Sequence, residues 1–472
     1  MDNKKKAVNI VWLKKDLRTQ DHAAFHAAEK SENDYLVIYI FEPTALAYPD
    51  RSLRHSQFIY HSILNMNELL QDSGREVVVF HTEAVDVFAY LHDQYTIDTV
   101  FSYQESGIRQ TWVRDKAVAK YLKSHGTEWV EYQRDGIVRG LKDIALWDNQ
   151  WNTFVNEKII ANQFSRSSMV LHDHPFPIQE SLLGELKDYP DSFQKAGENF
   201  AWKYLRSFCQ DRGKNYCRDI SKPSESRKSC GRISPYLSWG NFTIKQVAQY
   251  VSVHPNYERY NRGFVGMLTR LKWHCHFIQR FETDCDYETI CANRAFESME
   301  FTNDLAVIEA WENARTGFPL VDACMNCLKE TGWINFRMRA MLVSMLCHHF
   351  DCDWRKGMYH LARLFLDYEP GIHYPQFQMQ AGTTDINTVR IYNPIKQSKD
   401  HDPKGTFIKK WVKELKDIPV EFIHEPMSMT QLDKQYAGIE LHYPAPIVSV
   451  DTAAKKAREK IWGYRNSIGL EK

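Results

Sequence analysis

The sequence has no excess of charge of either sign. Among its 472 residues, 60 Lys and Arg balance 60 Asp and Glu, so the formal net charge is zero. A neutral chain has no overall attraction to nucleic acids or anionic membranes. Composition therefore excludes a uniformly basic polyanion binder, and only local basic stretches remain to be considered.

Long hydrophobic runs are absent as well. No apolar run approaches the ~20 residues that a membrane helix needs. The N-terminal stretch MDNKKKAVNIVW carries charges but no apolar signal segment. We therefore expect a monomeric cytoplasmic protein that does not enter a membrane.

Cysteine is missing outside the middle of the chain, because all ten cysteines lie between Cys209 and Cys352. Without a leader sequence, they are expected to be reduced thiols. Cys324 and Cys327 form a CxxC, but inside the helical pattern FPLVDACMNCLKETGW. No second CxxC completes a zinc or iron–sulfur set, so we predict helix-core residues and no metal.

The chain is too long for one core, so two domains are expected. Five short apolar runs alternate with helical patterns in its first third: VNIVWL (8–13), YLVIYIF (35–41), EVVVF (76–80), TVFSY (99–103) and WVEYQ (129–133). One helical pattern begins at about Ala23. A second, SQFIYHSILNMNELLQDSG, ends at Gly74, and two more cover about 83–93 and 109–125.

This alternation predicts a doubly wound parallel α/β sheet, whose ligands bind beyond the carboxyl ends of the strands. The usual dinucleotide fingerprint GxGxxG does not follow the first strand. We predict an α/β domain over 1–135, an interdomain connection over 136–199, an all-helical domain over 200–426 and a tail over 427–472.

The stretch DYEPGIHYPQFQMQAGT, from Asp367 to Thr383, gathers carboxylate, imidazole, phenol and amide groups. Its density of Pro and Gly predicts a fixed loop rather than a helix. Such a loop is either a binding surface or a connection between helices.

Two stretches are locally basic. Residues 206–232 and 386–416 each hold eight basic against three acidic residues. Either they bind a polyanion or each is a solvated helix face. Between them, SCGRISPYLSWG (229–240) opens a helix at Ser234 and Pro235, where free backbone N–H groups, the helix dipole and Arg232 suit a diphosphate.

Several segments resemble the DNA photolyase/cryptochrome family. They are VWLKKDLRTQDH (11–22), GRISPYLSWG, WHCHFIQRF (273–281), residues 310–346, DWRKGMYHLARLFLDYE (353–369) and RIYNPIKQSKDHDPKGTFIKKWVKEL. The resemblance covers residues 8 to about 426. It implies an N-terminal α/β domain and an all-helical C-terminal domain that holds a U-shaped FAD. It also allows a second, antenna chromophore of folate or deazaflavin type, with Glu105 near its expected place.

The resemblance further implies the cofactor contacts. Those expected for FAD are Tyr216, Cys230, Gly231, Arg232, Ile233, Ser234, Trp273, His274, Asn335, Arg339, Asp367, Tyr368, Glu369 and His373. Arg339 is expected to pair with Asp367. His373 stands where repair enzymes have Asn facing flavin N5. It either exchanges a proton there or bonds backbone instead.

Two family features are altered. The tryptophan positions of the usual electron chain read Phe377, Trp354 and Phe301, so either photoreduction is slow or another route exists, with Tyr368, Tyr374, Trp333 and Trp311 as candidates. The lesion-pocket positions read Arg270, Phe336, Ala340 and Met379, and only the stacking residue Trp273 is kept.

Two functions of different classes remain. The first is a light-driven lyase that repairs pyrimidine dimers in DNA, with His373, Trp273 and Trp354 as catalytic residues and Arg270, Trp273, Phe336 and Met379 as substrate contacts. The second is a cryptochrome-like receptor with a protein partner. A dark flavoenzyme ranks third, because no site for a hydride acceptor is visible.

Overall fold

The computed structural model describes residues 5–165, 169–384 and 390–469. The chain forms two compact units, each built from separate segments. Unit 1 comprises Met1–Gly213, Gly231–Asp286 and Leu366–Ile372, and unit 2 comprises Lys214–Cys230, Tyr287–Phe365 and His373–Lys472. The predicted domain boundaries at 135, 199 and 426 stay predictions.

Unit 1 contains a five-stranded parallel sheet in the order β3-β2-β1-β4-β5. Its strands are β1 (Ala7–Leu13), β2 (Asp34–Phe41), β3 (Val77–His81), β4 (Thr96–Tyr103) and β5 (Glu128–Tyr132). Val8 pairs with Asp34 of β2, and Thr99 of β4 pairs with Glu128 of β5. The predicted sheet is confirmed, and its strand order changes direction between β1 and β4.

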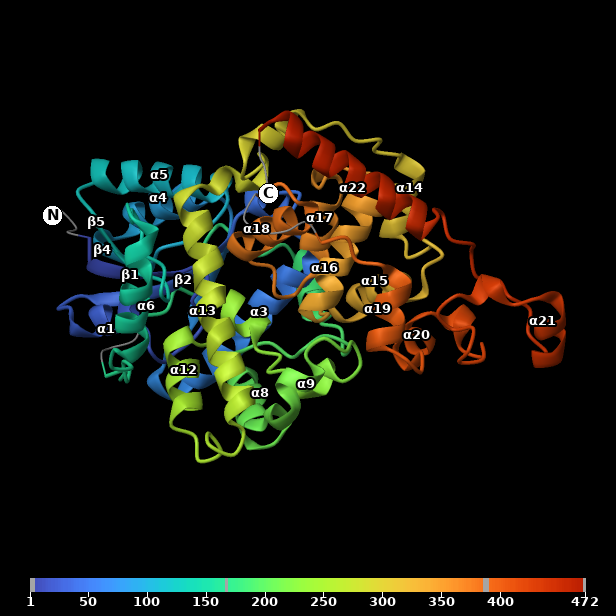
Figure 1. The fold of residues 1–472 in the computed structure, drawn as a ribbon. Coiled ribbons are helices and arrows are strands. Elements are labelled where there is room, and N and C mark those ends of the chain that lie inside the picture. Colours follow the sequence, from blue (N-terminus) through green and yellow to red (C-terminus); the bar gives the residue numbers. More distant parts are fainter. Residues whose placement is uncertain (1–4, 166–168, 385–389, 470–472) are drawn as a thin grey trace. The chain divides into compact units, whose positions relative to one another are not determined.

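The sheet forms because its strands are apolar and rich in β-branched residues, which pack well when buried on both faces. The helices α4 (Ala84–Gln94) and α5 (Arg109–Ser124) lie together over the sheet (Figure 1). They share one core with it, in which Phe88 meets Trp12 edge-on at 5.3 Å between ring centroids.

The other helices of unit 1 are α1 (Ala23–Lys30), α2 (Pro43–Leu46), α3 (Leu53–Leu70), α6 (Trp147–Asn156), α7 (Glu180–Lys187), α8 (Glu198–Gln210), α11 (Ser234–Ser238), α12 (Ile244–Ser252) and α13 (Asn261–Thr283). A 3-10 turn continues α3 and ends at Gly74, whose φ of 65° is left-handed. Glycine adopts that conformation at little steric cost, and the predicted helix end is confirmed there.

Unit 2 is helical in its described parts. Its helices are α9 (Tyr216–Asp219), α10 (Ser226–Ser229), α14 (Leu305–Glu312), α15 (Pro319–Thr331), α16 (Phe336–Ser344), a π-helical turn (Met345–His349), α17 (Arg355–Leu364), α19 (Pro394–His401), α20 (Thr406–Trp411), α21 (Gln431–Ala437) and α22 (Val450–Ser467). Short 3-10 turns lie at Arg294–Ser298, Lys413–Leu415 and Pro426–Ser428.

The CxxC lies within α15, where Cys324 and Cys327 are buried. Burial raises the pKa of the Cys324 thiol well above its usual value. Among the described residues, no three His, Cys, Asp or Glu side chains form a group suited to a metal ion.

The predicted loop over Asp367–Thr383 is wrong, because most of it is helix α18 (Pro370–Ala381). Pro370 is its first residue, where a missing N–H removes no helical hydrogen bond, and Pro375 lies within the helix. Gly371 belongs to unit 1, where a Cβ at this position would stand 2.8 Å from the Ile278 Cα of α13. The glycine therefore permits a close helix contact instead of breaking the helix.

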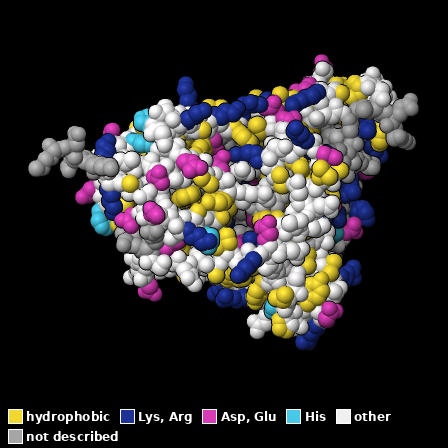
Figure 2. All heavy atoms as spheres, turned by 90° about the vertical axis from the view of Figure 1, so that its left-hand side faces the viewer, with side chains coloured by type: hydrophobic (Ala, Val, Ile, Leu, Met, Phe, Trp, Pro, Cys, Tyr) yellow, Lys and Arg dark blue, Asp and Glu magenta, His cyan; other side chains and the backbone are white. Residues whose placement is uncertain are grey.

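The surface reflects the balanced composition. Figure 2 shows a face on which Lys and Arg side chains are interspersed with acidic and hydrophobic ones. The first four residues (386–389) of the second basic stretch lie outside the described residues. Of the helices described, none has both the length and the apolarity required for a membrane span.

Candidate cofactor site

Two of the sequence motifs meet in unit 1. Trp239 Nε1 donates a hydrogen bond of 2.8 Å to the Leu366 carbonyl, and Ser238 Oγ donates one of 3.0 Å to the Asp367 carbonyl. Both donors belong to the motif SCGRISPYLSWG, and both acceptors belong to the segment Leu366–Ile372. The backbone on which Asp367, Tyr368 and Glu369 stand is therefore fixed by the C-terminal end of α11.

Glu369 is buried between two cations of the same unit. Lys15 Nζ lies 3.3 Å from each of its carboxylate oxygens, and Arg134 Nη2 lies 2.9 Å from Oε2. Burial alone would raise the pKa of Glu369, but Arg134 and Lys15 outweigh burial and hold this pKa below its usual value. Glu369 is thus an anion at neutral pH.

Sequence reasoning missed Lys15 and Arg134. Both follow the carboxyl ends of strands, β1 and β5 respectively. Because ligand sites of parallel sheets lie at that edge, two cations just after strands were an available signal.

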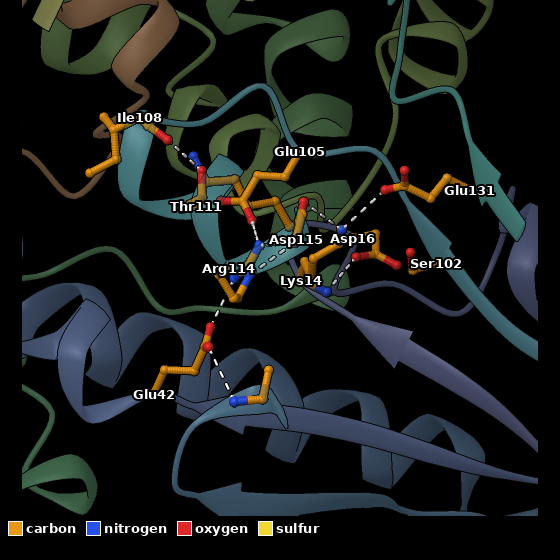
Figure 3. Close-up of polar contacts among 12 residues, drawn as sticks. Lys14, Asp16, Glu42, Ser102, Glu105, Ile108, Thr111, Arg114, Asp115 and Glu131 are labelled. Atoms are coloured by element: carbon orange, nitrogen blue, oxygen red, sulfur yellow. Dashed lines mark hydrogen bonds and ion pairs between the residues drawn. The ribbon is translucent and has the colours of Figure 1, made fainter. Parts of the chain in front are cut away.

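A second ionic network occupies the same edge of the sheet (Figure 3). Arg114 pairs with Glu42 at 2.9 Å, Glu105 at 2.7 Å and Asp115 at 2.9 Å. Burial alone would raise the pKa of Glu105, but the cations around it, Arg114 foremost, hold that pKa far below its usual value. The expected antenna role of Glu105 stays a prediction, and its carboxylate is bound to Arg114.

A small cavity opens beside this network. It measures about 70 Å³ and is lined by residues that include Trp12, Lys14, Lys15, Arg51, Glu105 and Trp239. It lies at the ends of β1 and β4, where the order of the parallel strands reverses, and a doubly wound sheet commonly binds its ligand at such a point.

The loop before α11 is built around Arg232. Its φ of 57° is left-handed, which is uncommon for a residue other than glycine. Its guanidinium donates to Gln194 Oε1 at 2.6 and 2.9 Å, and Gln194 Nε2 donates back to the Arg232 carbonyl at 2.8 Å. Ile233 precedes the helix and Ser234 is its first residue. The guanidinium is therefore oriented by Gln194.

Helix α13 carries three predicted site residues. Trp273 is 52% exposed, and Arg270 stands one turn before it. His274 is the neighbour of Trp273, and burial lowers the pKa of its imidazole below the usual value. His274 Nε2 is buried and bonds to no group among the described residues.

In unit 2, Asn335 connects two predicted contacts. It precedes α16, and its Nδ2 donates 2.9 Å to the carbonyl of Ile220, just after the helix that Tyr216 opens. Tyr216 is 6% exposed, and Cys230 follows α10 in this unit. Asn335 Oδ1 is buried and accepts no hydrogen bond within the described part of the chain.

Arg339 lies one turn further along α16. Its Nε donates to the Ile334 carbonyl at 2.9 Å, and its guanidinium stands 4.0 Å from the centroid of the Phe365 ring. The expected pairing of Arg339 with Asp367 involves residues of different units and stays a prediction.

His373 makes a backbone contact of the kind named in one of its two expected arrangements. Its Nε2 lies 2.8 Å from the Met358 carbonyl, so this nitrogen carries the hydrogen and donates it to backbone. The His373 ring is 5.6 Å from that of Phe377. A role at flavin N5 stays a prediction, and Nδ1 would be the nitrogen that performs it.

The remaining predicted residues of unit 2 differ in exposure. Trp354 is buried, Phe336 is 53% exposed at the start of α16, Ala340 is buried and Met379 is half-buried. The structure therefore leaves Phe336 accessible to a large ligand and encloses Trp354.

These residues fit a polar cofactor such as FAD. Leaving a buried donor or acceptor unsatisfied is costly, and His274 Nε2 and Asn335 Oδ1 are two such atoms among the predicted contacts. His274 belongs to unit 1 and Asn335 to unit 2, and in each unit by itself this is the kind of atom that the hydroxyl, amide and ring-nitrogen groups of FAD can satisfy. At Gly231, a Cβ would stand 2.4 Å from Met267 Cε, so a side chain at this position would require the flexible end of Met267 to move.

Comparisons with known proteins agree with this fit. A family model described as the FAD binding domain of DNA photolyase matches residues 267–463, and one described as DNA photolyase matches residues 9–143. A deoxyribodipyrimidine photo-lyase of Alkalihalophilus pseudofirmus is 25% identical over 96% of this chain and 97% of its own.

Two solved structures share the fold. A cryptochrome of Synechocystis aligns with a TM-score of 0.86 and 22% identity, covering 97% of this chain and all of its own. An archaeal photolyase of Sulfolobus tokodaii, solved with two FAD molecules, aligns with a TM-score of 0.81 and 24% identity, covering 97% of this chain and 100% of its own.

Proposed function

Because the chain belongs to the DNA photolyase and cryptochrome family and carries its FAD-binding domain, we propose that it is a blue-light-driven lyase that splits pyrimidine dimers in DNA. Reduced FAD, once bound and excited, supplies the electron that opens the dimer. The protein's residues bind and orient the flipped lesion and keep water from it.

The observation that supports this proposal is the exposure of Trp273. A tryptophan that is 52% exposed on a long helix is a stacking platform for an unpaired base, a contact worth about 1–3 kcal/mol per base. Arg270, one turn away and also exposed, suits a phosphate beside the lesion.

Three features favour the second candidate, a photoreceptor. His373 donates to backbone, Phe377 replaces a tryptophan, and Phe336 and Ala340 stand where lesion pockets of the family have Asn and Met or a pair of histidines. A receptor would use the same flavin and read its reduction through a protein partner.

Repair of a defined lesion tests the proposal. Pre-reduced protein would receive one oligonucleotide with a cyclobutane dimer and another with a (6-4) product, under blue light and in the dark. We expect light-dependent loss of one lesion. Absence of repair by protein that holds FAD would contradict the lyase and favour the receptor.

A matched pair of variants separates stacking from general surface effects. Trp273→Ala should weaken lesion binding by roughly 10- to 100-fold, the equivalent of one lost stack. Tyr436→Ala removes an aromatic residue that is 96% exposed on α21 and should leave binding unchanged. FAD content is measured in both variants.

A further inference from the structure

Tyr368 occupies a fixed position between two expected flavin contacts, Asp367 and Glu369. The segment is held on both sides, by Ser238 at the Asp367 carbonyl and by Lys15 and Arg134 at the Glu369 carboxylate. The tyrosine is 1% exposed. Its side chain is therefore enclosed, and its contacts with Asp50 and His55 both lie within unit 1.

The phenol of Tyr368 is bonded to a buried carboxylate. Its Oη donates to Asp50 Oδ2 at 2.6 Å, which is the length of a charge-assisted O–H···O⁻ bond. Asp50 is fully buried, and Arg51 Nε lies 3.5 Å from its other oxygen. A phenol with a carboxylate at this distance has a proton acceptor already in place.

We propose that Tyr368 is a redox-active tyrosine that reduces light-excited FAD by one electron and passes its phenolic proton to Asp50. The Oη–H bond breaks, an Oδ2–H bond forms, one electron leaves the phenol and the flavin gains it. The product on the protein is a neutral tyrosyl radical beside a protonated Asp50. A thiol reductant later returns one electron, and the proton moves back to Tyr368.

Tyr368 would supply the electron in place of the family's tryptophan chain, which is interrupted in this sequence. Of the three positions in unit 2, two read Phe377 and Phe301, whose rings are hard to oxidise. The proposal uses the FAD of the family and depends on neither the lyase nor the receptor function.

The surroundings explain why the oxidised site would stay at Tyr368. Its ring stacks on His55 at 5.6 Å, and His55 lies 5.7 Å from the oxidisable ring of Trp239. Lys15 and Arg51 stand 5.5 and 5.7 Å from the Trp239 ring centroid. Two cations disfavour a tryptophan radical cation between them, whereas a tyrosyl radical that has lost its proton is neutral.

Two other candidates are less suited to the same task. Trp311 Nε1 donates to the Leu342 carbonyl, which cannot take a proton. Trp333 has the Arg227 guanidinium 5.9 Å from its ring centroid, so a positive charge on its ring is opposed. Tyr374 lies against the His373 ring at 5.3 Å and serves as the competing site in the test.

Transient absorption and electron paramagnetic resonance after a blue flash test the proposal on the full-length, FAD-loaded, oxidised protein. We expect a neutral tyrosyl signal that changes shape when the protein contains ring-deuterated tyrosine and forms more slowly in D₂O. Both measurements use the unaltered chain, so they do not depend on the folding of a variant.

Variants then assign the residue. Tyr368→Phe should lose the tyrosyl signal when that signal is expressed per bound FAD, and Asp50→Asn should slow or abolish its formation. Tyr443→Phe is the matched control, because Tyr443 also donates to a buried carboxylate, that of Asp322 in unit 2. It should leave the signal unchanged.

Three results would overturn the proposal. One is an unchanged radical in Tyr368→Phe, and another is its loss in Tyr374→Phe instead. The third is a rate of tyrosyl-radical formation that changes neither in Asp50→Asn nor in D₂O. That result would show that Asp50 is not the proton acceptor.

Discussion

Glu369 in unit 1 and Asp322 in unit 2 are both buried carboxylates, yet their pKa values shift in opposite directions. Glu369 contacts two cations, Lys15 and Arg134. Within the described part of the chain, the donors to Asp322 are all neutral: Thr316 at 2.7 and 3.0 Å, the Gly317 backbone at 3.2 Å and Tyr443. Burial raises the pKa of Asp322, and its hydrogen bonds do not offset this effect.

The difference shows what each carboxylate contributes. A buried anion between cations stabilises only while all its partners are present, since each remaining charge would be costly alone. A buried acid among neutral donors ties chain segments together, here Thr316–Gly317 and the chain at Tyr443. The first arrangement belongs to the candidate cofactor site, and the second is structural.

The largest effect is expected from Glu369→Ala. It leaves Lys15 and Arg134 buried without their shared anion and should lower the free energy of unfolding by about 3–5 kcal/mol. Urea denaturation measures it. Glu157→Ala, an exposed acid after α6 in the same unit, is the control. Equal effects of the two changes would show that the ionic cluster does not stabilise unit 1.

A smaller effect is expected from Asp322→Asn. The amide group replaces one acceptor oxygen by a donor that faces other donors, which costs about 1–3 kcal/mol. Tyr443→Phe removes one hydrogen bond and should cost about 0.5–1.5 kcal/mol. If Asp322→Asn lowers the free energy of unfolding by less than Tyr443→Phe does, the Asp322 carboxylate is not the group that holds these hydrogen bonds together.

The smallest effect is a difference in pH dependence. The folded pKa of Glu369 is below its unfolded value of 4.5, so its contribution to stability is present above pH 4.5 and is lost as the pH falls through the folded pKa. The folded pKa of Asp322 is above 3.8, so its contribution is full below pH 3.8 and is lost as the pH rises through the folded pKa.

Stability measured from acid to neutral pH checks these signs. The difference in free energy of unfolding between wild type and Glu369→Gln should grow with rising pH. The corresponding difference for Asp322→Asn should shrink. The same slope for both variants would contradict the comparison.

Local sequence patterns predicted the sheet well. Alternating apolar runs and helical periods act over a few residues, and each strand lies within about three residues of its predicted place. Gly74 and the helical CxxC were predictable for the same reason. The segment Asp367–Thr383 was not, because Gly371 serves a contact with α13 that is remote in sequence.

The sequence by itself determined the strands, the helices that alternate with them and, through resemblance, the family and its FAD. Only the tertiary structure decided which groups meet the candidate site residues. Lys15 and Glu369 are 354 positions apart, and Tyr368 and Asp50 are 318 apart. No local propensity encodes such pairs, because they form only when folding buries both members in one core and each charge or donor must find its partner there.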